Sequence, residues 1–313
     1  MNLQGMTLSG GFTLSNAPPP PPMPAPAPAG SAMALTYDLA APGNTDGLTI
    51  SVPLGSSAFG SPAPNVIVDW GDGSNNTYTS TGVKSHTYSS TGTYQVTITG
   101  TLPEWRQDNY GGTAKQKALI SVDKWTNALG LTSLRQAFDG AINLQAVPDN
   151  LPSGVTTLQG AFRLTKIASP TISSWNTSNV TNMYGTFIDA VFNQPIGNWN
   201  VGNVTNMYYT FYNASTFNQN IGTWNVSNVT DMEAMFQGAT SFNQNISSWN
   251  VGNVTNMPYM FQGATSFNQN LSSWITGLTS QPTAFTSGAN AIFANNSNLL
   301  KPFLSNGTTR ITT

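Results

Sequence analysis

The chain of 313 residues has no cysteine, one histidine and few charged side chains. Without cysteine it forms no disulfide, which leaves its redox compartment undetermined. The first residues contain neither the basic segment nor the continuous apolar segment of a secretory signal. We also expect no membrane span, because no later stretch is long and apolar enough to cross a bilayer.

Charge is especially scarce in the C-terminal half. Charged residues make up 7% of the chain, whereas about 25% is typical of soluble domains. Residues 167–300 contain no Lys or Arg, and their only acids are Asp189, Asp231 and Glu233. Such a surface cannot neutralise phosphates, so we expect no nucleic-acid partner there.

A repeat occupies this uncharged region. Five tryptophans recur 24, 25, 25 and 25 residues apart, at Trp175, Trp199, Trp224, Trp249 and Trp274. Phe138, Phe162 and Phe285 extend the period outward, to about seven units. A period of this length predicts a solenoid, in which each coil buries its apolar face against the next.

The apolar residues that recur at one phase are expected to form the core of the solenoid. They are Trp199, Trp224, Trp249, Met207, Met232, Met257, Phe211, Phe236 and Phe261. Within each unit, alternation in I-S-S-W-N-V predicts a short strand, and stacked copies would form a parallel sheet. The spacing in M-x-x-M-F-x-G-A predicts one or two helical turns that end at Gly238 or Gly263.

Asparagine also recurs at fixed phases, as at Asn203, Asn228 and Asn253. Many of these residues stand in N-x-S/T, so glycosylation is one interpretation. A ladder of amides that satisfies backbone groups between coils is the favoured one, because a ladder requires the same phase in every copy and glycosylation does not.

Tyrosines occupy variable positions beside the recurring Met and Phe. Aromatic rings among amides suit recognition of carbohydrate or protein, which makes these residues the candidate ligand face. The alternative is that the rings only cover the edge of the coils. The candidates are Tyr184, Tyr208, Tyr209, Tyr212 and Tyr259.

Short strands with glycine-rich turns precede the repeats. Residues 66–68, 94–98 and 48–52 have strand patterns, and Gly71-Asp72-Gly73 predicts a turn with positive φ. Together they indicate a β-sandwich.

The same segment contains the residues that could suggest chemistry. Asp69 and Asp72 raise the possibility of a calcium site, and His86 that of a general base. No nucleophile set, metal-ligand spacing or phosphate loop accompanies them. We therefore expect structural roles, no enzyme activity, and no catalytic, cofactor or metal site.

The N-terminal residues resemble an anchor followed by a spacer. Met6, Leu8, Phe12 and Leu14 alternate with small polar residues and could add a strand to a partner's sheet edge. The prolines of residues 17–29 predict a stiff polyproline II segment. A disordered tail is the alternative.

Three motifs resemble known families. W-N-V-G-N-V-T-N-M, from Trp199 to Met207, resembles the BspA-like leucine-rich surface repeats, which implies a leucine-rich-repeat-like solenoid on a surface protein, often called adhesive. V-I-V-D-W-G-D-G-S (66–74) with H-T-Y-S-S-T-G-T-Y-Q-V (86–96) resembles the PKD-type immunoglobulin-like domain, which implies a spacer or protein-contact module. The leader L-Q-G-M-T-L-S-G-G (3–11) is similar to structural proteins of tailed phages, including cyanophages.

We therefore expect a mainly β protein, with an immunoglobulin-like β-sandwich followed by a leucine-rich-repeat-like solenoid and an extended N-terminal arm. The expected units are an anchor arm (1–16), a polyproline II spacer (17–31), the sandwich with its joining segment (32–124), the solenoid (125–295) and a C-terminal tail (296–313). The segment 118–125 resembles the join between the two domain types, so we expect them to pack together.

The expected function is that of a non-enzymatic virion structural protein, in the capsid decoration or the tail. Its arm would bind capsid or tail proteins, and multiple copies on the outer surface of the virion would adhere to a cell-surface glycan or protein. One alternative is a cellular surface adhesin with leucine-rich repeats. The other is a carbohydrate-binding accessory module.

Overall fold

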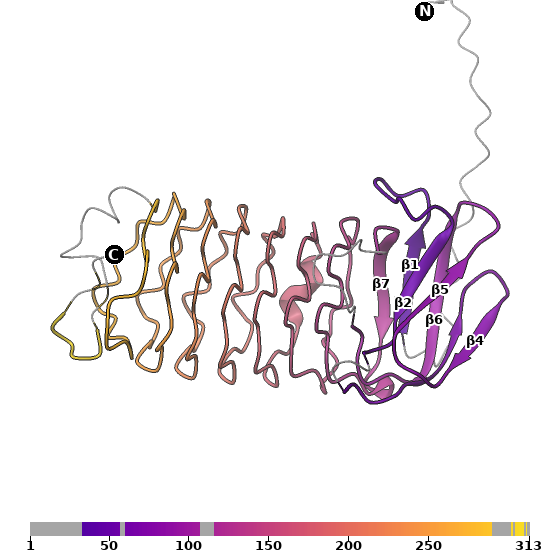
Figure 1. Ribbon diagram of the computed structural model, residues 1–313, viewed down its shortest axis with the longest axis horizontal. Coiled ribbons are helices and arrows are strands. Elements are labelled where there is room, and N and C mark those ends of the chain that lie inside the picture. The colour runs from indigo at the N-terminus through magenta and orange to yellow at the C-terminus, as the bar shows by residue number, and fades with distance from the viewer. Residues whose placement is uncertain are drawn as a thin grey trace, which may run out of the picture.

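The computed structural model describes residues 33–56, 60–106, 116–289, 302, 304–309 and 311. It is an elongated molecule, with β-sheets at one end and stacked coils running from them to the other end (Figure 1). The predicted anchor arm and spacer lie outside the described residues. Within the described residues the structure is mainly β and has no α-helix, and its helical segments are two short 3-10 helices, η2 (Asn127–Leu129) and η3 (Pro170–Ser174).

Two antiparallel sheets form the N-terminal domain. One has five strands in the order β4-β3-β6-β1-β7, and the other pairs β2 with β5. The strands are β1 (Met33–Asp38), β2 (Thr49–Pro53), β3 (Asn65–Asp69), β4 (Asn75–Tyr78), β5 (Val83–Thr87), β6 (Thr93–Thr101) and β7 (Leu119–Trp125).

The three strands predicted in this region are confirmed as β2, β3 and β6. Val66 and Val68 alternate inward in β3, and Val68 lies opposite Ile98 of β6, where both side chains are buried. The turn after β3 has the predicted positive φ, +78° at Gly71. A Cβ there would lie 2.4 Å from the carbonyl oxygen of Gln95, so only glycine fits.

The segment predicted to join the two regions is strand β7. It pairs with β1 on one side, and on the other side its Ser121 forms a parallel bridge with Ala146 of the first coils. The indole of Trp125 donates to the carbonyl of Asn150 at 2.6 Å. An edge strand of the sheet is thereby covered by the coils, and one apolar core continues from the sheets into the repeats.

Parallel contacts between coils are present, but each is a bridge of a single residue. The bridging residues form one row along the repeats: Glu104, Ser133, Thr157, Asn182, Asn206, Asp231 and Asn256. The predicted strand at I-S-S-W-N-V is wrong. Ser247 and Ser248 form a turn there, with the Trp249 amide donating to the carbonyl of Ile246 at 3.1 Å.

Side chains replace strand hydrogen bonds on this side of the coil. Ser248 Oγ donates to the carbonyl of Gly222 at 2.8 Å, and the Trp249 indole donates to that of Ile221 at 3.1 Å. The backbone can therefore turn here while the coils stay linked.

The predicted helical turn at M-x-x-M-F-x-G-A is also wrong, because its amides alternate between two kinds of partner. The amides of Ala234 and Phe236 donate to Pro258 and Met260 of the next coil, at 2.8 and 2.9 Å. The amide between them, on Met235, bonds back to Met232 at 3.2 Å. An α-helix needs every amide for its own i−4 carbonyl, so bonding between coils excludes it.

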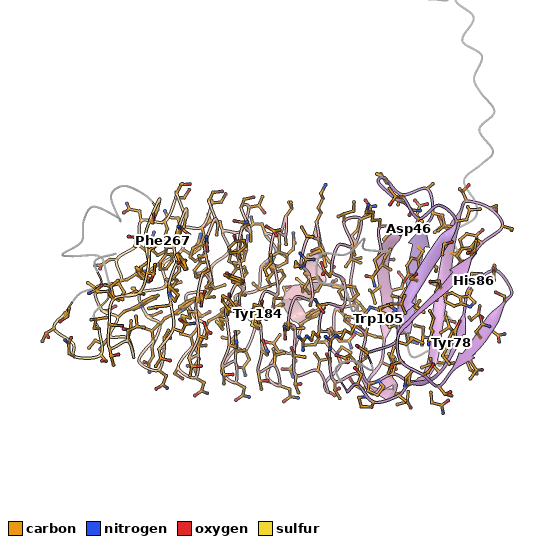
Figure 2. All side chains as sticks on the ribbon, viewed as in Figure 1. Asp46, Tyr78, His86, Trp105, Tyr184 and Phe267 are labelled. Carbon is orange, nitrogen blue, oxygen red and sulfur yellow. The ribbon has the colours of Figure 1, made fainter. Side chains whose placement is uncertain are left out.

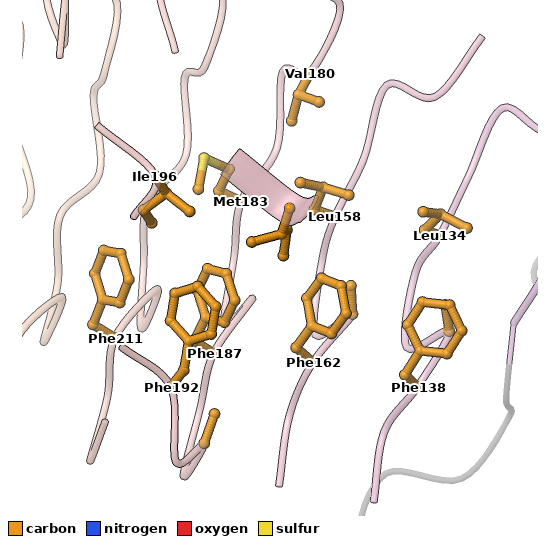
Figure 3. Close-up of a cluster of buried hydrophobic side chains, with 14 of the residues drawn as sticks. Leu134, Phe138, Leu158, Phe162, Val180, Met183, Phe187, Phe192, Ile196 and Phe211 are labelled. Atoms are coloured by element: carbon orange, nitrogen blue, oxygen red, sulfur yellow. The ribbon is translucent and has the colours of Figure 1, made fainter. Parts of the chain in front are cut away.

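Aromatic side chains form a continuous column through the coils. Phe138, Phe162, Phe187 and Phe211 follow one another along the core, beside a row of aliphatic side chains (Figure 3). Ring centroids of successive members, from Phe138 to Phe285, are 5.4–5.7 Å apart. The column confirms the period of about seven units read from the sequence.

The asparagine ladder predicted between coils is present. Asn203, Asn228 and Asn253 donate from Nδ2 to backbone carbonyls of the preceding coil, at 2.7, 2.6 and 2.7 Å. A second row joins the Asn218 and Asn243 positions, where the Asn243 amide donates to Asn218 Oδ1 at 3.0 Å. The first row satisfies backbone carbonyls, and the second satisfies backbone amides, that the irregular coils leave without strand partners.

Candidate ligand-binding surface

Four of the five candidate tyrosines lie together on two neighbouring coils. Each of the two leading tyrosines follows a bridging asparagine by two residues, and the asparagine fixes it. Asn182 Oδ1 accepts the amide of Tyr184 at 2.8 Å, and Asn206 Oδ1 accepts that of Tyr208 at 2.9 Å. The same short turn therefore presents both rings, and Tyr184 lies near the middle of the molecule (Figure 2).

The four rings are in contact. Tyr184 stacks on Tyr208, with centroids 5.0 Å apart and ring planes within 8°. The ring centroid of Tyr209 lies 3.8 Å from that of Tyr208 and 4.8 Å from that of Tyr212. All four side chains are half-buried, so each has one part packed and another open to solvent. We call these four residues the tyrosine patch.

Tyr259 stands apart from the patch. Among the described residues its ring stacks on none of the four. Between its coil and theirs lies the coil of Met232, which carries Ala234 at the phase of Tyr209 and Tyr259. The repeat puts Tyr259 at the correct phase, but the aromatic surface does not continue to it.

The backbone at Tyr209 is left-handed, with φ of 59°, and Tyr259 has φ of 58°. Gly160 and Gly185 fill this phase in two earlier coils, with φ of 60° and 59°. A tyrosine in this conformation costs about 1–2 kcal/mol that glycine does not. The fold requires the conformation, but not the ring.

Two of the three acids in residues 167–300 flank the patch. Glu233 stands at the phase of Tyr184 and Tyr208, one coil on, and its carbonyl accepts the amide of Tyr209 at 3.0 Å. On the other side, the Asp189 amide donates to the carbonyl of Tyr212 at 2.9 Å. Burial, a hydrogen bond with Tyr209 and the negative charge of Glu233 raise the pKa of Tyr208, so its hydroxyl stays neutral.

From the sequence, we cite these acids only as evidence that charge is scarce and do not place them beside the tyrosines. Their phases were the available signal, since Glu233 falls 25 residues after Tyr208. Identifying the acids with the tyrosine face required knowing that this phase points outward.

The residues that could suggest chemistry in the N-terminal domain contact their own turn and a neighbouring ring. His86 Nε2 lies 2.7 Å from Asp72 Oδ2, and the imidazole stacks on Trp70 with centroids 4.8 Å apart. Asp69 Oδ1 accepts the amide of Gly71 at 2.9 Å. Across the described residues, no group of three or more His, Cys, Asp or Glu side chains is placed to hold a metal ion.

The carboxyl group of Asp72 has a lowered pKa. Desolvation alone would raise the pKa of Asp72, but hydrogen bonds from Ser74 and His86 together outweigh it and lower the pKa to about 2. The carboxylate therefore fixes the turn after β3 through the Ser74 amide, at 3.0 Å.

The remaining candidates are the core and the anchor. The nine repeat residues named for the core are all buried, with at most 3% of any one exposed. Met6, Leu8, Phe12 and Leu14 lie outside the described residues.

A family model described as "Mycoplasma protein of unknown function, DUF285" matches residues 132–228 and 191–299. No curated protein and no solved structure matches the chain. No helix in the described ranges combines the length and apolarity needed to span a membrane. The family match is to cellular proteins and does not link the chain to a virion, so it favours the alternative of a cellular adhesin over the expected phage role.

Proposed function

Because the chain belongs to the DUF285 family of Mycoplasma proteins of unknown function, we propose that it is a non-enzymatic adhesin displayed at a cell surface. In this proposal the N-terminal sheets are an immunoglobulin-like spacer. The coils are a leucine-rich-repeat-like scaffold that presents the tyrosine patch to a partner.

The tyrosine patch is the observation that carries the proposal. Tyrosine combines a broad apolar ring with a polar hydroxyl, and it loses little conformational entropy on binding, which is why it is enriched at recognition surfaces. Here hydrogen bonds to Asn182 and Asn206 hold the backbone amides of Tyr184 and Tyr208, and the two rings stack on each other. A surface held in place before the partner arrives loses less entropy on binding.

The side chain at the left-handed phase also favours a binding role. Glycine occupies this phase in two coils, and others have Gln136, Ala234, Tyr259 or Ala284 there, so the fold accepts several side chains. A residue retained in an unfavourable conformation motivates a functional hypothesis when its side chain contributes little to the core. The half-buried ring of Tyr209 contributes to the patch instead.

The location is tested with an antibody against the coils, applied to intact and permeabilised source cells. We expect equal labelling of both. Labelling that appears only after permeabilisation would overturn the surface proposal.

Adhesion is tested with beads coated with the purified chain and presented to the surfaces that the source organism colonises. Tyr208→Ala should reduce bead attachment severalfold, while the matched control Tyr259→Ala should not. Equal attachment by both variants would show that the patch is not the adhesive surface.

A further inference from the structure

The tyrosine patch carries a charge pattern that points to one ligand chemistry. Residues 167–300 have three charged side chains, all acidic: Asp189, Asp231 and Glu233. Asp189 and Glu233 form backbone hydrogen bonds with Tyr212 and Tyr209 of the patch, and Asp231 does so with Met207 beside it. Asp231 Oδ1 accepts the amide of Glu233 at 2.9 Å and so fixes the start of the turn that carries Glu233.

The Glu233 carboxylate is held in place by a neutral amide and not by a cation. Asn256 Nδ2 donates to its Oε2 at 3.1 Å, and within the described residues its Oε1 has no hydrogen-bond partner. Asp189 is similar, since its Oδ1 accepts Asn213 Nδ2 at 3.0 Å. Each of the two acids is therefore contacted by the neutral amide of an asparagine and not by a cation.

Among the described residues, no ion pair joins Asp189, Asp231 or Glu233 to a cation. The coil before Tyr184 carries Arg163, but its guanidinium already pairs with the buried Asp139, with Nε 3.0 Å from Oδ1. In the sequence, the next basic residues on either side of residues 167–300 are Lys166 and Lys301. The patch is thus an aromatic surface with an uncompensated negative rim.

Aromatic faces and carboxylates attract the same kind of group. The face of a tyrosine ring is the negative part of its quadrupole and binds a guanidinium or ammonium within about 6 Å of the centroid. A carboxylate beside the ring adds charge-assisted hydrogen bonds, which match the planar guanidinium best. A neutral sugar would use the rings but gain nothing from the acids, and an anionic polymer would be repelled.

We propose that the tyrosine patch binds arginine side chains of a basic segment in a partner protein. The guanidinium lies over Tyr208 and Tyr209, and its charge faces Glu233. This inference rests on the proposed adhesive role of the patch and names its ligand. Two adjacent coils of rings allow more than one arginine to bind at once.

The experiment measures fluorescence anisotropy of the full chain with a labelled peptide of alternating arginine and serine. The control peptide replaces arginine by citrulline, which keeps the shape of the side chain and removes its charge. We expect binding of the arginine peptide that weakens with salt, and at least about tenfold weaker binding of the citrulline peptide. Equal binding of the two peptides would overturn the proposal.

Variants separate the patch from general attraction by an acidic chain. Glu233→Gln should weaken arginine-peptide binding about fivefold, whereas Asp149→Asn removes one exposed charge elsewhere and should change it less than twofold. Tyr209→Gly should weaken binding, and Tyr259→Gly, which relieves the same backbone conformation outside the patch, should not. Equal effects within either pair would overturn the assignment of the site.

Failure of this inference is distinguishable from failure of the proposed function. If the arginine peptide does not bind while a neutral oligosaccharide does, and Tyr208→Ala abolishes that binding, the patch is adhesive and only the ligand is wrong. If the peptide binds but the antibody labels only permeabilised cells, the ligand stands and the cell-surface role is wrong.

Discussion

The aromatic column makes a quantitative prediction for Phe236→Ala. Phe236 is fully buried, and its ring centroid lies 5.6 Å from Phe211, 4.0 Å from Phe242 and 5.7 Å from Phe261. Removing a buried phenylalanine ring costs about 3–5 kcal/mol, as lost transfer free energy plus a cavity. Because coils on both sides lose a stacking partner, we expect about 4 kcal/mol, near the middle of that range.

The assay is urea unfolding followed by tryptophan fluorescence, since the Trp249 ring centroid lies 6.4 Å from that of Phe236 and Trp224 belongs to the same core. The midpoint should fall while the slope stays nearly constant, because the surface exposed on unfolding hardly changes. The matched control is Phe285→Ala. Its ring meets Phe261 edge-on at the end of the column, so a loss of about half that of Phe236→Ala is expected.

Two results would contradict this prediction. One is a loss below about 1 kcal/mol for Phe236→Ala, which is less than the transfer free energy of the ring alone. The other is an equal loss at the end and the middle of the column. The first result would mean that the ring is not enclosed, and the second that the coils do not depend on neighbours on both sides.

Three further predictions concern the links between coils and the N-terminal turn. Gly238→Ala should destabilise the chain by about 2–3 kcal/mol in the same urea assay, because its Cβ would lie 2.1 Å from the side-chain oxygen of Asn213. Gly263→Ala has the same left-handed φ but no atom nearer than 3.8 Å, so it should cost about 1 kcal/mol, and similar losses for the two variants would contradict the packing. Asn228→Ala should cost about 1 kcal/mol through the lost amide bond to the preceding coil, and mass spectrometry of the native protein should find Asn228 without a glycan, whereas a glycan there would contradict the ladder. Asp72 has a folded pKa lowered from 3.8 to about 2, so its contribution is complete above pH 4 and is lost as the pH falls toward 2; Asp72→Asn should flatten stability across that window by about 1 kcal/mol after allowance for solvent screening, and an unchanged acid profile would refute the role of this carboxylate.

The sequence by itself determined the architecture of the repeats. A strict phase of Phe and Trp over units of 24–25 residues permits few arrangements other than stacking in register, which the column from Phe138 to Phe285 has. The asparagine ladder followed for the same reason, since identical residues at one phase must meet when coils stack. In the N-terminal domain, alternation at Val66 and Val68 was enough to locate a strand, because one face of that sheet is buried.

Tertiary structure decided the conformation within each coil and the composition of the candidate surface. Local patterns predicted a strand around Trp249 and a helix around Met232. Instead, tight local turns alternate with hydrogen bonds to neighbouring coils, which neither regular element allows. The patch required two further facts that spacing alone does not contain. These are that the phase of Tyr208 and Glu233 points outward, and that Ala234 interrupts the aromatic surface before Tyr259. Periodicity fixes which residues meet, because stacking is a relation between copies, whereas the direction of each side chain depends on the path that the backbone takes between them.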